Sequence, residues 1–319
     1  VDHSTINYME FRKDFYIEVP EIAKLSKSEV KEYRSSLGNI RIRGKKCPRP
    51  IKGFHQCGLS DRILETLKKH AYTKPTPIQA QAIPAIMSGR DVIGIAKTGS
   101  GKTLAFLLPM LRHILDQPLP TNGEGPIGII MAPTRELAVQ IHLELRRISK
   151  HLGIKSVCIF GGSGISHQIG DLKRGAAVAV CTPGRMIDIL CTNAGRVTNL
   201  RRVTYLVLDE ADRMFDMGFE PQIMRIIDNI RPDRQTVMFS ATFPRQVEAA
   251  ARKILKRPII EIIVGGVSVV CSDVKQIVEV RSPATRFARL LQILGEWNDK
   301  GSILIFVNQQ DECDNIFRR

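Results

Sequence analysis

The sequence has few aromatic residues and lacks a hydrophobic run long enough to cross a membrane. Aromatic residues make up 6% of the 319 positions, and only one of them is tryptophan. No apolar stretch approaches the ~20 residues that a transmembrane helix needs, and the first residues lack the apolar core of a signal peptide. We therefore expect no membrane association. The hydrophobic share of 43% and the charged share of 25% are typical of globular proteins.

The cysteines form no recognisable framework. Their number is odd, and no two of them have the C-x-x-C spacing of zinc or redox sites. We therefore predict reduced thiols, as in an intracellular protein, and neither a disulfide scaffold nor a zinc site. The seven are Cys47, Cys57, Cys158, Cys181, Cys191, Cys271 and Cys313. Because the chain begins with Val1 and not with Met, we expect it to be a piece of a longer protein.

Acidic residues are outnumbered by basic ones. There are 47 Lys and Arg against 32 Asp and Glu, which gives a formal net charge of +15. Such an excess points to a polyanionic partner such as RNA or DNA, although a generic basic surface would give the same number. Seven basic residues and no acid lie between Arg34 and Lys52. This segment is either an arm that faces nucleic acid or a solvated basic loop.

A glycine-rich turn between two apolar segments is the most informative motif. The run 91–95 predicts a buried strand, 104–108 predicts a buried helix, and Ala96-Lys97-Thr98-Gly99-Ser100-Gly101-Lys102-Thr103 joins them. This is the arrangement of a phosphate-binding loop, in which glycine backbone N–H groups and a helix N-terminus face an anion. Lys102 can reach the β- and γ-phosphates, and the Thr103 hydroxyl can bind Mg²⁺.

Apolar strands alternate with helical patterns from residue 91 onward. The expected strands lie near 91–96, 127–132, 154–160, 177–181, 203–208, 235–240 and 259–264. This alternation predicts an α/β fold with a doubly wound parallel sheet, helices on both faces and ligands at the carboxyl ends of the strands. A further β-α-β pattern, with strands at 276–280 and 302–307 around a helix at 284–297, predicts the incomplete start of a second domain.

The predicted organisation has four parts. An extension spans residues 1–53, the main domain spans 54–264, a linker spans 265–275, and the start of the second domain spans 276–319. In the extension, an apolar patch is expected to dock onto another surface, and it consists of Phe11, Phe15, Tyr16, Ile17 and Val19. Ser26 and Glu29 form a capping box that predicts a short helix ending near Gly38.

Two polar positions suggest nucleotide chemistry beyond the loop. Gln79 stands at the capping-box position of a helix that begins after Thr76, so a cap is its simplest interpretation. Its amide also matches the N6 and N7 edge of adenine. Asp209 and Glu210 end a predicted buried strand, where the first would hold Mg²⁺ through water and the second would orient the attacking water. An acidic helix start is the simpler alternative for this pair.

The tetrad Asp209-Glu210-Ala211-Asp212 makes the chain resemble a DEAD-box RNA helicase, a family with two RecA-like domains around a P-loop. Other family motifs match in order and spacing, and they cover the chain from about residue 54 to its end. They are Lys74 to Gln79, the loop 96–103, Pro133 to Leu137, Gly161-Gly162, Thr182 to Arg185, Ser240-Ala241-Thr242 and Ile303 to Asn308.

The resemblance implies roles for the matching positions. Catalysis would rest on Lys102, Asp209 and Glu210, with Mg²⁺ held by Thr103 and Asp209. ATP would be bound by Phe54, Lys74, Gln79, Thr98, Gly99, Ser100, Gly101, Lys102 and Thr103. The RNA sugar-phosphate backbone would be bound by Thr134, Arg135, Gly162, Thr182 and Arg185, whose hydroxyl, guanidinium and backbone N–H groups suit phosphates. Thr134 also suits a helix cap. Domain closure would be coupled to the nucleotide through Asp212, Ser240 and Thr242.

The sequence departs from the family pattern at two places. Ala71 stands where a glycine usually precedes the aromatic residue, here Tyr72. The late motifs, including the arginine finger, are missing, so we expect this chain to bind nucleotide but hydrolyse it poorly. An arginine finger is worth about 10³–10⁵ in rate in related phosphoryl transfer.

The flanking segments are most similar to the spliceosomal branch of the family, in particular to members that act when the branch-site ribonucleoprotein joins pre-mRNA. These segments are Tyr8 to Ala23, Cys47 to Ile51, Asp216 to Gln222 and Gly266 to Cys271, the last with Val267 where the branch has arginine. The resemblance implies spliceosomal proteins as partners and a nuclear location.

The motifs admit three functions. The first is an ATP-dependent RNA helicase. The second is an ATP-gated RNA clamp or assembly scaffold that rarely turns over. The third is a P-loop kinase or transporter ATPase, which would not need the RNA-directed motifs.

Overall fold

The computed structural model describes residues 1–266 and 274–318, and the chain divides into two compact units, Val1–Val269 and Val270–Arg319. The first unit is built around one sheet of eight strands in the order β1-β8-β2-β7-β6-β3-β5-β4. The strands are β1 (Arg41–Arg43), β2 (Val92–Ile95), β3 (Gly128–Met131), β4 (Ser156–Ile159), β5 (Val178–Cys181), β6 (Tyr205–Leu208), β7 (Gln235–Ser240) and β8 (Ile260–Ile263). Strands β2 to β8 are parallel to one another, which confirms the predicted doubly wound sheet.

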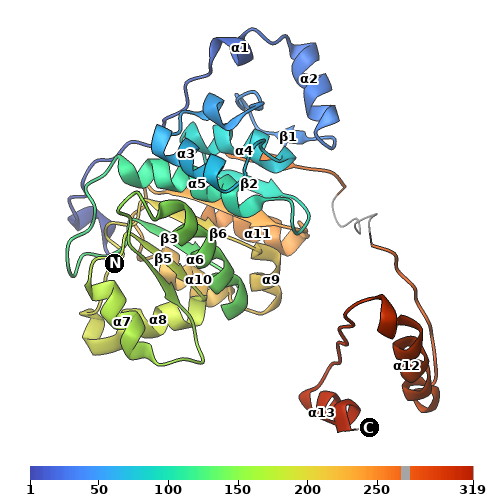
Figure 1. Ribbon diagram of the computed structural model, residues 1–319. Helices are drawn as coiled ribbons and strands as arrows, with labels where there is room; N and C mark the ends of the chain where they lie inside the picture. Colours follow the sequence, from blue (N-terminus) through green and yellow to red (C-terminus); the bar gives the residue numbers. More distant parts are fainter. Residues whose placement is uncertain (267–273, 319) are drawn as a thin grey trace. The chain divides into compact units, whose positions relative to one another are not determined.

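Helices cover both faces of this sheet (Figure 1). These covering helices are α3 (Asp61–Lys69), α4 (Pro77–Met87), α5 (Lys102–Leu115), α6 (Arg135–Ser149), α7 (Ile165–Lys173), α8 (Pro183–Cys191), α9 (Ala211–Asp216), α10 (Glu220–Ile227) and α11 (Arg245–Ile254). Two further helices of this unit, α1 (Pro20–Ala23) and α2 (Lys27–Ser36), contribute no residue to the two core clusters. Short 3₁₀ segments occur at His3–Thr5, Phe54–Cys57 and Thr192–Gly195. Within the described ranges, no helix combines the length and the apolar character that crossing a membrane requires.

Two hydrophobic clusters follow from the strand alternation. Side chains such as Ile130 and Val207 face the cluster beneath α3, α4, α5 and α6. Their neighbours Ile129 and Leu206 face the cluster beneath α8, α9, α10 and α11. Because successive residues of a strand point to opposite faces, a run of apolar residues is buried on both sides.

The strand β1 was not predicted. It lies inside the basic segment 34–52 and pairs antiparallel with β8, so this segment is neither a free arm nor simply a loop. Arg41 and Arg43 are exposed, and Arg43 forms an ion pair with Glu261 at 3.1 Å. Apolar periodicity could not reveal β1 because its three residues are mostly charged and its pairing depends on a partner more than 200 residues away.

Residues 8–16, which we call the N-terminal strap, pack against the rest of the first unit, as the apolar pattern predicted. The backbone N–H of Phe15 donates to the carbonyl of Met87 at 2.7 Å. The rings of Phe11 and Phe15 lie edge-on to buried His113, with centroids 5.4 and 6.1 Å away. Ile17, which was predicted as part of this patch, is instead 84% exposed.

The second unit contains α12 (Pro283–Trp297), a 3₁₀ turn (Asn298–Lys300) and α13 (Gln310–Arg318). The helix predicted at 284–297 is confirmed, but the strands predicted at 276–280 and 302–307 are wrong, since both segments lack sheet pairing. Their apolar side chains are exposed, 87% for Val278 and 86% for Phe306. A strand needs a hydrogen-bonding neighbour, and the described part of this unit supplies none. Residues 267–273 of the predicted linker, including most of the segment Gly266 to Cys271, lie outside the described residues.

Candidate functional site

The predicted functional residues gather at one edge of the sheet. Because β2 to β8 are parallel, their carboxyl ends share this edge, where α/β proteins bind ligands. One half of the edge, after β2, β6 and β7, carries the phosphate loop, Asp209 and Ser240. The other half, after β3, β4 and β5, carries Thr134, Gly162 and Thr182. The candidate site therefore has two adjacent parts on one rigid platform.

The phosphate loop needs its glycines for two different reasons. Gly99 and Gly101 have φ angles of +75° and +91°, which favour residues without a side chain. A Cβ on Gly99 would meet nothing within 4 Å, whereas one on Gly101 would lie 2.5 Å from Gln79 Nε2 and 2.9 Å from Thr76 Oγ1. Gly101 therefore also allows the loop to approach the start of α4 closely.

Lys102 lies folded into its own loop. Its Nζ donates to the carbonyl of Ala96 at 2.8 Å and to that of Lys97 at 3.5 Å, and the residue is 9% exposed. Burial lowers the pKa of Lys102, while the carboxylates of Asp209 and Glu210 act in the opposite direction. Phosphate oxygens could replace the two carbonyls as acceptors without moving the lysine out of the loop.

Gln79 joins the helix start to the phosphate loop. Its Oε1 accepts from the backbone N–H of Thr76 at 2.9 Å, which confirms the predicted cap. Its Nε2 donates to the carbonyl of Gly101 at 2.9 Å. Both amide groups are thus engaged within the protein, and adenine recognition by Gln79 stays a prediction.

Two buried hydroxyls near the loop have no hydrogen-bond partner among the described residues. They are Thr76 Oγ1 and Ser100 Oγ. Buried polar atoms are nearly always paired in folded proteins, so an unpaired one at a loop often marks a ligand position. Together with the open space at Gly99, these hydroxyls fit a bound phosphate group.

Asp209 and Glu210 occupy different environments. Asp209 is 3% exposed, and burial raises the pKa of its carboxyl to about 6, although Lys102 and the backbone N–H of Glu210 favour the charged form. Glu210 is partly exposed and has a φ of +49°, a strained conformation for a residue with a side chain. Its carboxylate lies 3.7 Å from Arg213 Nη1. The strand end thus carries a buried acid next to an accessible one.

Asp212 connects this acidic strand end to the neighbouring strand. Its Oδ2 accepts from the backbone N–H of Thr242 at 2.9 Å and from the Thr242 hydroxyl at 2.6 Å. Its own N–H donates to Ser240 Oγ at 3.3 Å. Burial would raise the pKa of Asp212, but the hydrogen bonds from Thr242 and Ser240 outweigh it and lower that pKa. The three residues predicted to couple the motifs are therefore in direct contact.

The second part of the edge presents two arginines beside a glycine turn. Thr134 Oγ1 accepts from the N–H of Leu137 at 3.3 Å and so caps α6, which leaves Arg135 exposed at its first position. The Arg135 guanidinium lies 5.0 Å from the centroid of the Phe160 ring. Gly162 has a φ of +79°, and a Cβ there would lie 3.6 Å from Arg135 Nη1.

Arg185 approaches the same turn from the next helix. Its Nη1 donates to the carbonyl of Ser163 at 3.0 Å, and its Nε lies 3.5 Å from Asp188 Oδ2. Thr182 precedes α8, and its N–H donates to the carbonyl of Ile159. The sequence did not indicate Phe160 and Ser163, which hold the two arginines, because they belong to no recognised motif.

Three of the residues predicted to bind ATP have differing surroundings. Phe54 is 5% exposed and packs in the core cluster beneath α4, so its ring is largely enclosed by protein. Lys74 is exposed in the turn before α4, and Thr98 is exposed in the phosphate loop. Nucleotide binding by Phe54 and Lys74 stays a prediction.

The donor set also fits a hard cation. Hydroxyl and carboxylate oxygens are the ligands that Mg²⁺ prefers, and the ion usually keeps several waters. Thr103 and Asp209 would supply one such oxygen each. The described residues contain no group of three or more His, Cys, Asp or Glu that could hold a metal by themselves.

Comparisons with known proteins give similarities over the whole chain. The family profile described as DEAD/DEAH box helicase matches residues 76–250. The chain is 64% identical over 318 residues to the human protein named probable ATP-dependent RNA helicase DDX46. This match covers 100% of the chain but 31% of the human protein, so the chain spans about a third of the relative's length.

Solved structures resemble the chain as well. The RNA helicase Prp28 from Chaetomium thermophilum bound to ADP has a TM-score of 0.70 and 35% identity, covering 95% of this chain and 71% of that one. The yeast DEAD-box splicing factor Prp28 has a TM-score of 0.72 and 28% identity, covering 92% and 69%.

Proposed function

Because the chain belongs to the DEAD/DEAH box helicase family, we propose that it forms part of an ATP-dependent RNA helicase. One observation carries the proposal. A single sheet edge bears a phosphate loop, a buried and an accessible acid, and a pair of arginines at a glycine turn. The first two suit nucleotide hydrolysis and the third suits a nucleic-acid backbone. A P-loop kinase or transporter ATPase would have no use for the arginines.

The phosphate loop binds ATP in this proposal. The N–H groups of Gly99 and Gly101 face the phosphates, and Lys102 exchanges the carbonyls of Ala96 and Lys97 for phosphate oxygens. Gln79 recognises the adenine edge. For this, its Nε2 gives up its hydrogen bond to the Gly101 carbonyl, or donates to that carbonyl and to adenine at the same time. Thr103 and Asp209 would hold Mg²⁺, which would neutralise phosphate charge.

Glu210 acts on the water that attacks the γ-phosphate. The residue is partly exposed at the strand end, and its carboxylate lies 3.7 Å from Arg213 Nη1. A carboxylate in this position can accept a proton from water and orient it. Asp212, through Thr242 and Ser240, links this strand end to β7, so that a change at the nucleotide moves both together.

The arginine half of the edge binds single-stranded RNA through its backbone. Arg135 and Arg185 supply charge, Thr134 and Thr182 supply hydroxyls, and Gly162 supplies an accessible N–H. Such contacts fix position and carry no base sequence. Closure on ATP and RNA would bend the strand and displace its complement, and hydrolysis would release it.

We place the protein in pre-mRNA splicing, in the nucleus, with spliceosomal proteins as partners. The yeast Prp28 structure is named a splicing factor, and the flanking segments Tyr8 to Ala23 and Cys47 to Ile51 resemble the spliceosomal branch. This assignment rests on similarity, whereas the ATP and RNA roles rest also on geometry.

Phosphate release tests the helicase function. The release of phosphate from ATP is measured with and without single-stranded RNA. The measurement is made for this chain and for a longer form that continues past Arg319. We expect RNA to stimulate the longer form, and Glu210→Gln to lower its turnover by about 10²-fold or more while ATP still binds. If ATP and RNA bind but turnover is negligible, and Glu210→Gln spares function, the protein is an ATP-gated clamp. If RNA does not bind, the RNA assignment is wrong.

A further inference from the structure

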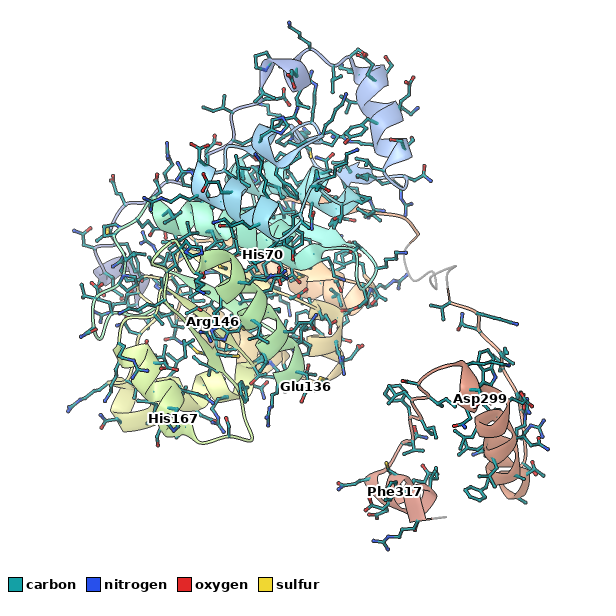
Figure 2. All side chains as sticks on the ribbon, viewed as in Figure 1. His70, Glu136, Arg146, His167, Asp299 and Phe317 are labelled. Carbon is teal, nitrogen blue, oxygen red and sulfur yellow. The ribbon has the colours of Figure 1, made fainter. Side chains whose placement is uncertain are left out.

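A basic cavity lies away from the nucleotide and RNA residues. It has a volume of about 680 Å³ between the end of α6, the start of β4 and the end of α7. Five cations line it, namely Arg146, Arg147, Lys150, Lys155 and Arg174, together with the acid Asp171. Figure 2 shows Arg146 and Glu136 near opposite ends of α6. Arg146 follows Arg135 by eleven residues, which places it about 16 Å further along the helix axis.

The cations come from three elements, so one local cause does not explain them. Arg146, Arg147 and Lys150 lie at the end of α6, where the helix dipole favours positive charge. Arg174 is the C-cap of α7 and is favoured by the dipole of that second helix, whereas Lys155 precedes β4 and belongs to no helix. Their convergence on one concavity concentrates positive potential there.

Two of these cations are not neutralised within the protein. Arg147 lies 3.7 Å from Glu144 and Arg174 pairs with Asp171, while Lys155 Nζ donates to the carbonyl of Arg174. Arg146 and Lys150 are exposed, and neither has an ion-pair partner within 4 Å among residues 1–266 and 274–318. The cavity is therefore a net positive site with two available cations.

The remaining lining distinguishes between possible ligands. Leu143 is 58% exposed and supplies most of the apolar surface of the cavity, since the other apolar lining residues, Ile154 and Ala176, are only 7% and 2% exposed. Among the described residues, no Phe, Tyr or Trp lines the cavity, and its one ring, that of His142, is half-buried with its Nε2 3.0 Å from Ser156 Oγ. Surfaces that bind the bases of single-stranded RNA combine cations with aromatic residues on which those bases stack. Cations around an exposed leucine instead match a peptide that carries both carboxylates and an apolar side chain.

We propose that this cavity binds an acidic peptide segment of a partner protein. Carboxylates of the segment pair with Arg146 and Lys150, and an apolar side chain covers Leu143. The site is independent of the phosphate loop, so it could hold the protein on its partner throughout a nucleotide cycle. It does not require the proposed helicase function.

Peptide binding to this chain tests the proposal directly. The probe is a short fluorescein-labelled peptide of Glu, Asp and Leu, and the control probe has Gln and Asn in place of the acids. We expect the acidic peptide to bind, and the double variant Arg146→Glu/Lys150→Glu to bind it roughly tenfold more weakly. Leu143→Ser should also weaken binding, and added salt should weaken it further.

A matched variant controls for net charge. Lys24→Glu/Lys31→Glu makes the same change at two exposed residues near α1 and α2, and it should leave peptide binding unchanged. Equal loss in both double variants would overturn the site, as would binding of the neutral peptide with the same affinity. A circular dichroism melt confirms that each variant is folded before its binding is compared.

Binding of single-stranded oligouridylate tests whether RNA, and not an acidic peptide, occupies the cavity. The proposal predicts that Arg146→Glu/Lys150→Glu leaves oligouridylate binding within about twofold of the unmodified chain. If the variant loses RNA and the acidic peptide does not bind the unmodified chain, the cavity extends the RNA surface and the proposal is wrong.

Discussion

Ala71 carries a side chain at a backbone conformation that favours glycine. Its φ is +59°, in the turn that leads from α3 to Tyr72. Such a conformation costs a residue with a Cβ about 1 kcal/mol or more. The DEAD-box resemblance placed a glycine here, and the backbone gives the physical reason for it.

We predict that Ala71→Gly stabilises the protein. The expected gain is about 0.5–1 kcal/mol in the free energy of unfolding, since released strain exceeds the added freedom of the unfolded chain. Gly153→Ala is the matched control, because Gly153 has a φ of +70° and open space around its Cβ position. Gly153→Ala should lower the free energy of unfolding by about 1 kcal/mol. Urea unfolding measures both, and a loss for Ala71→Gly would contradict the prediction.

The Thr242 hydroxyl is the second residue-scale test. It donates to Asp212 at 2.6 Å, and Thr242→Val removes this bond while preserving shape. We predict a loss of about 1.5–3 kcal/mol in unfolding free energy, because a hydrogen bond to a charged group is lost. Thr242→Ser keeps the hydroxyl and should retain most of the stability. Similar losses in both variants would show that the methyl group matters more than the hydrogen bond.

At the scale of elements, the N-terminal strap packs against a histidine that stays neutral in the folded protein. His113 is 1% exposed in α5, and burial lowers its pKa to about 3. Its Nε2 lies 2.8 Å from Thr204 Oγ1, and the rings of Phe11 and Phe15 pack against it. The strap therefore covers a group that binds a proton more readily in the unfolded chain than in the folded one.

This difference predicts acid lability. Between pH 6.5 and about 3 the unfolded chain binds a proton at His113 that the folded chain does not, so stability falls as pH falls through this window. The contribution is on the order of a few kcal/mol. Urea unfolding measures the free energy of unfolding at pH 7 and at pH 4.5. The decrease between the two pH values should be smaller for His113→Gln than for the unmodified protein. Equal differences in the two proteins would show that His113 does not titrate as described.

At the scale of the whole molecule, the first unit has a large buried core, and the described part of the second unit has almost none. In the first unit, the seven parallel strands are almost continuously buried, whereas α12 and α13 contain no buried residue. Segments 276–280 and 302–307 are exposed and unpaired. Backbone amides without hydrogen-bonded partners exchange with solvent far faster than those of a sheet.

Hydrogen exchange should show this contrast. We predict that amides of 276–280 and 302–307 exchange within the earliest time points, while those of β2, β6 and β7 remain protected for times longer by several orders of magnitude. Mass spectrometry of peptides from this chain measures both regions in one sample. Slow exchange at 302–307 would mean that this segment is paired as a strand after all.

Most of the main sheet was predictable from local patterns. All seven parallel strands were expected within a few residues, because strands buried on both faces are apolar at nearly every position. Strand β1 was missed, and the two strands of the second unit were predicted wrongly. In each case the result depends on whether a partner strand is present, which no local pattern records.

The candidate site was likewise predictable where it depends on local sequence and unpredictable where it depends on contacts between distant segments. The sequence by itself determined the residue types of the phosphate loop, the Asp-Glu strand end and the basic helix starts, because their chemistry depends on neighbours along the chain. Only the tertiary structure decided that Lys102 closes on Ala96, that Gln79 bonds Gly101, and that Arg146 and Lys155 face one cavity. These contacts join segments whose distance in space is set by strand order and helix packing, and strand order is not written in any single segment.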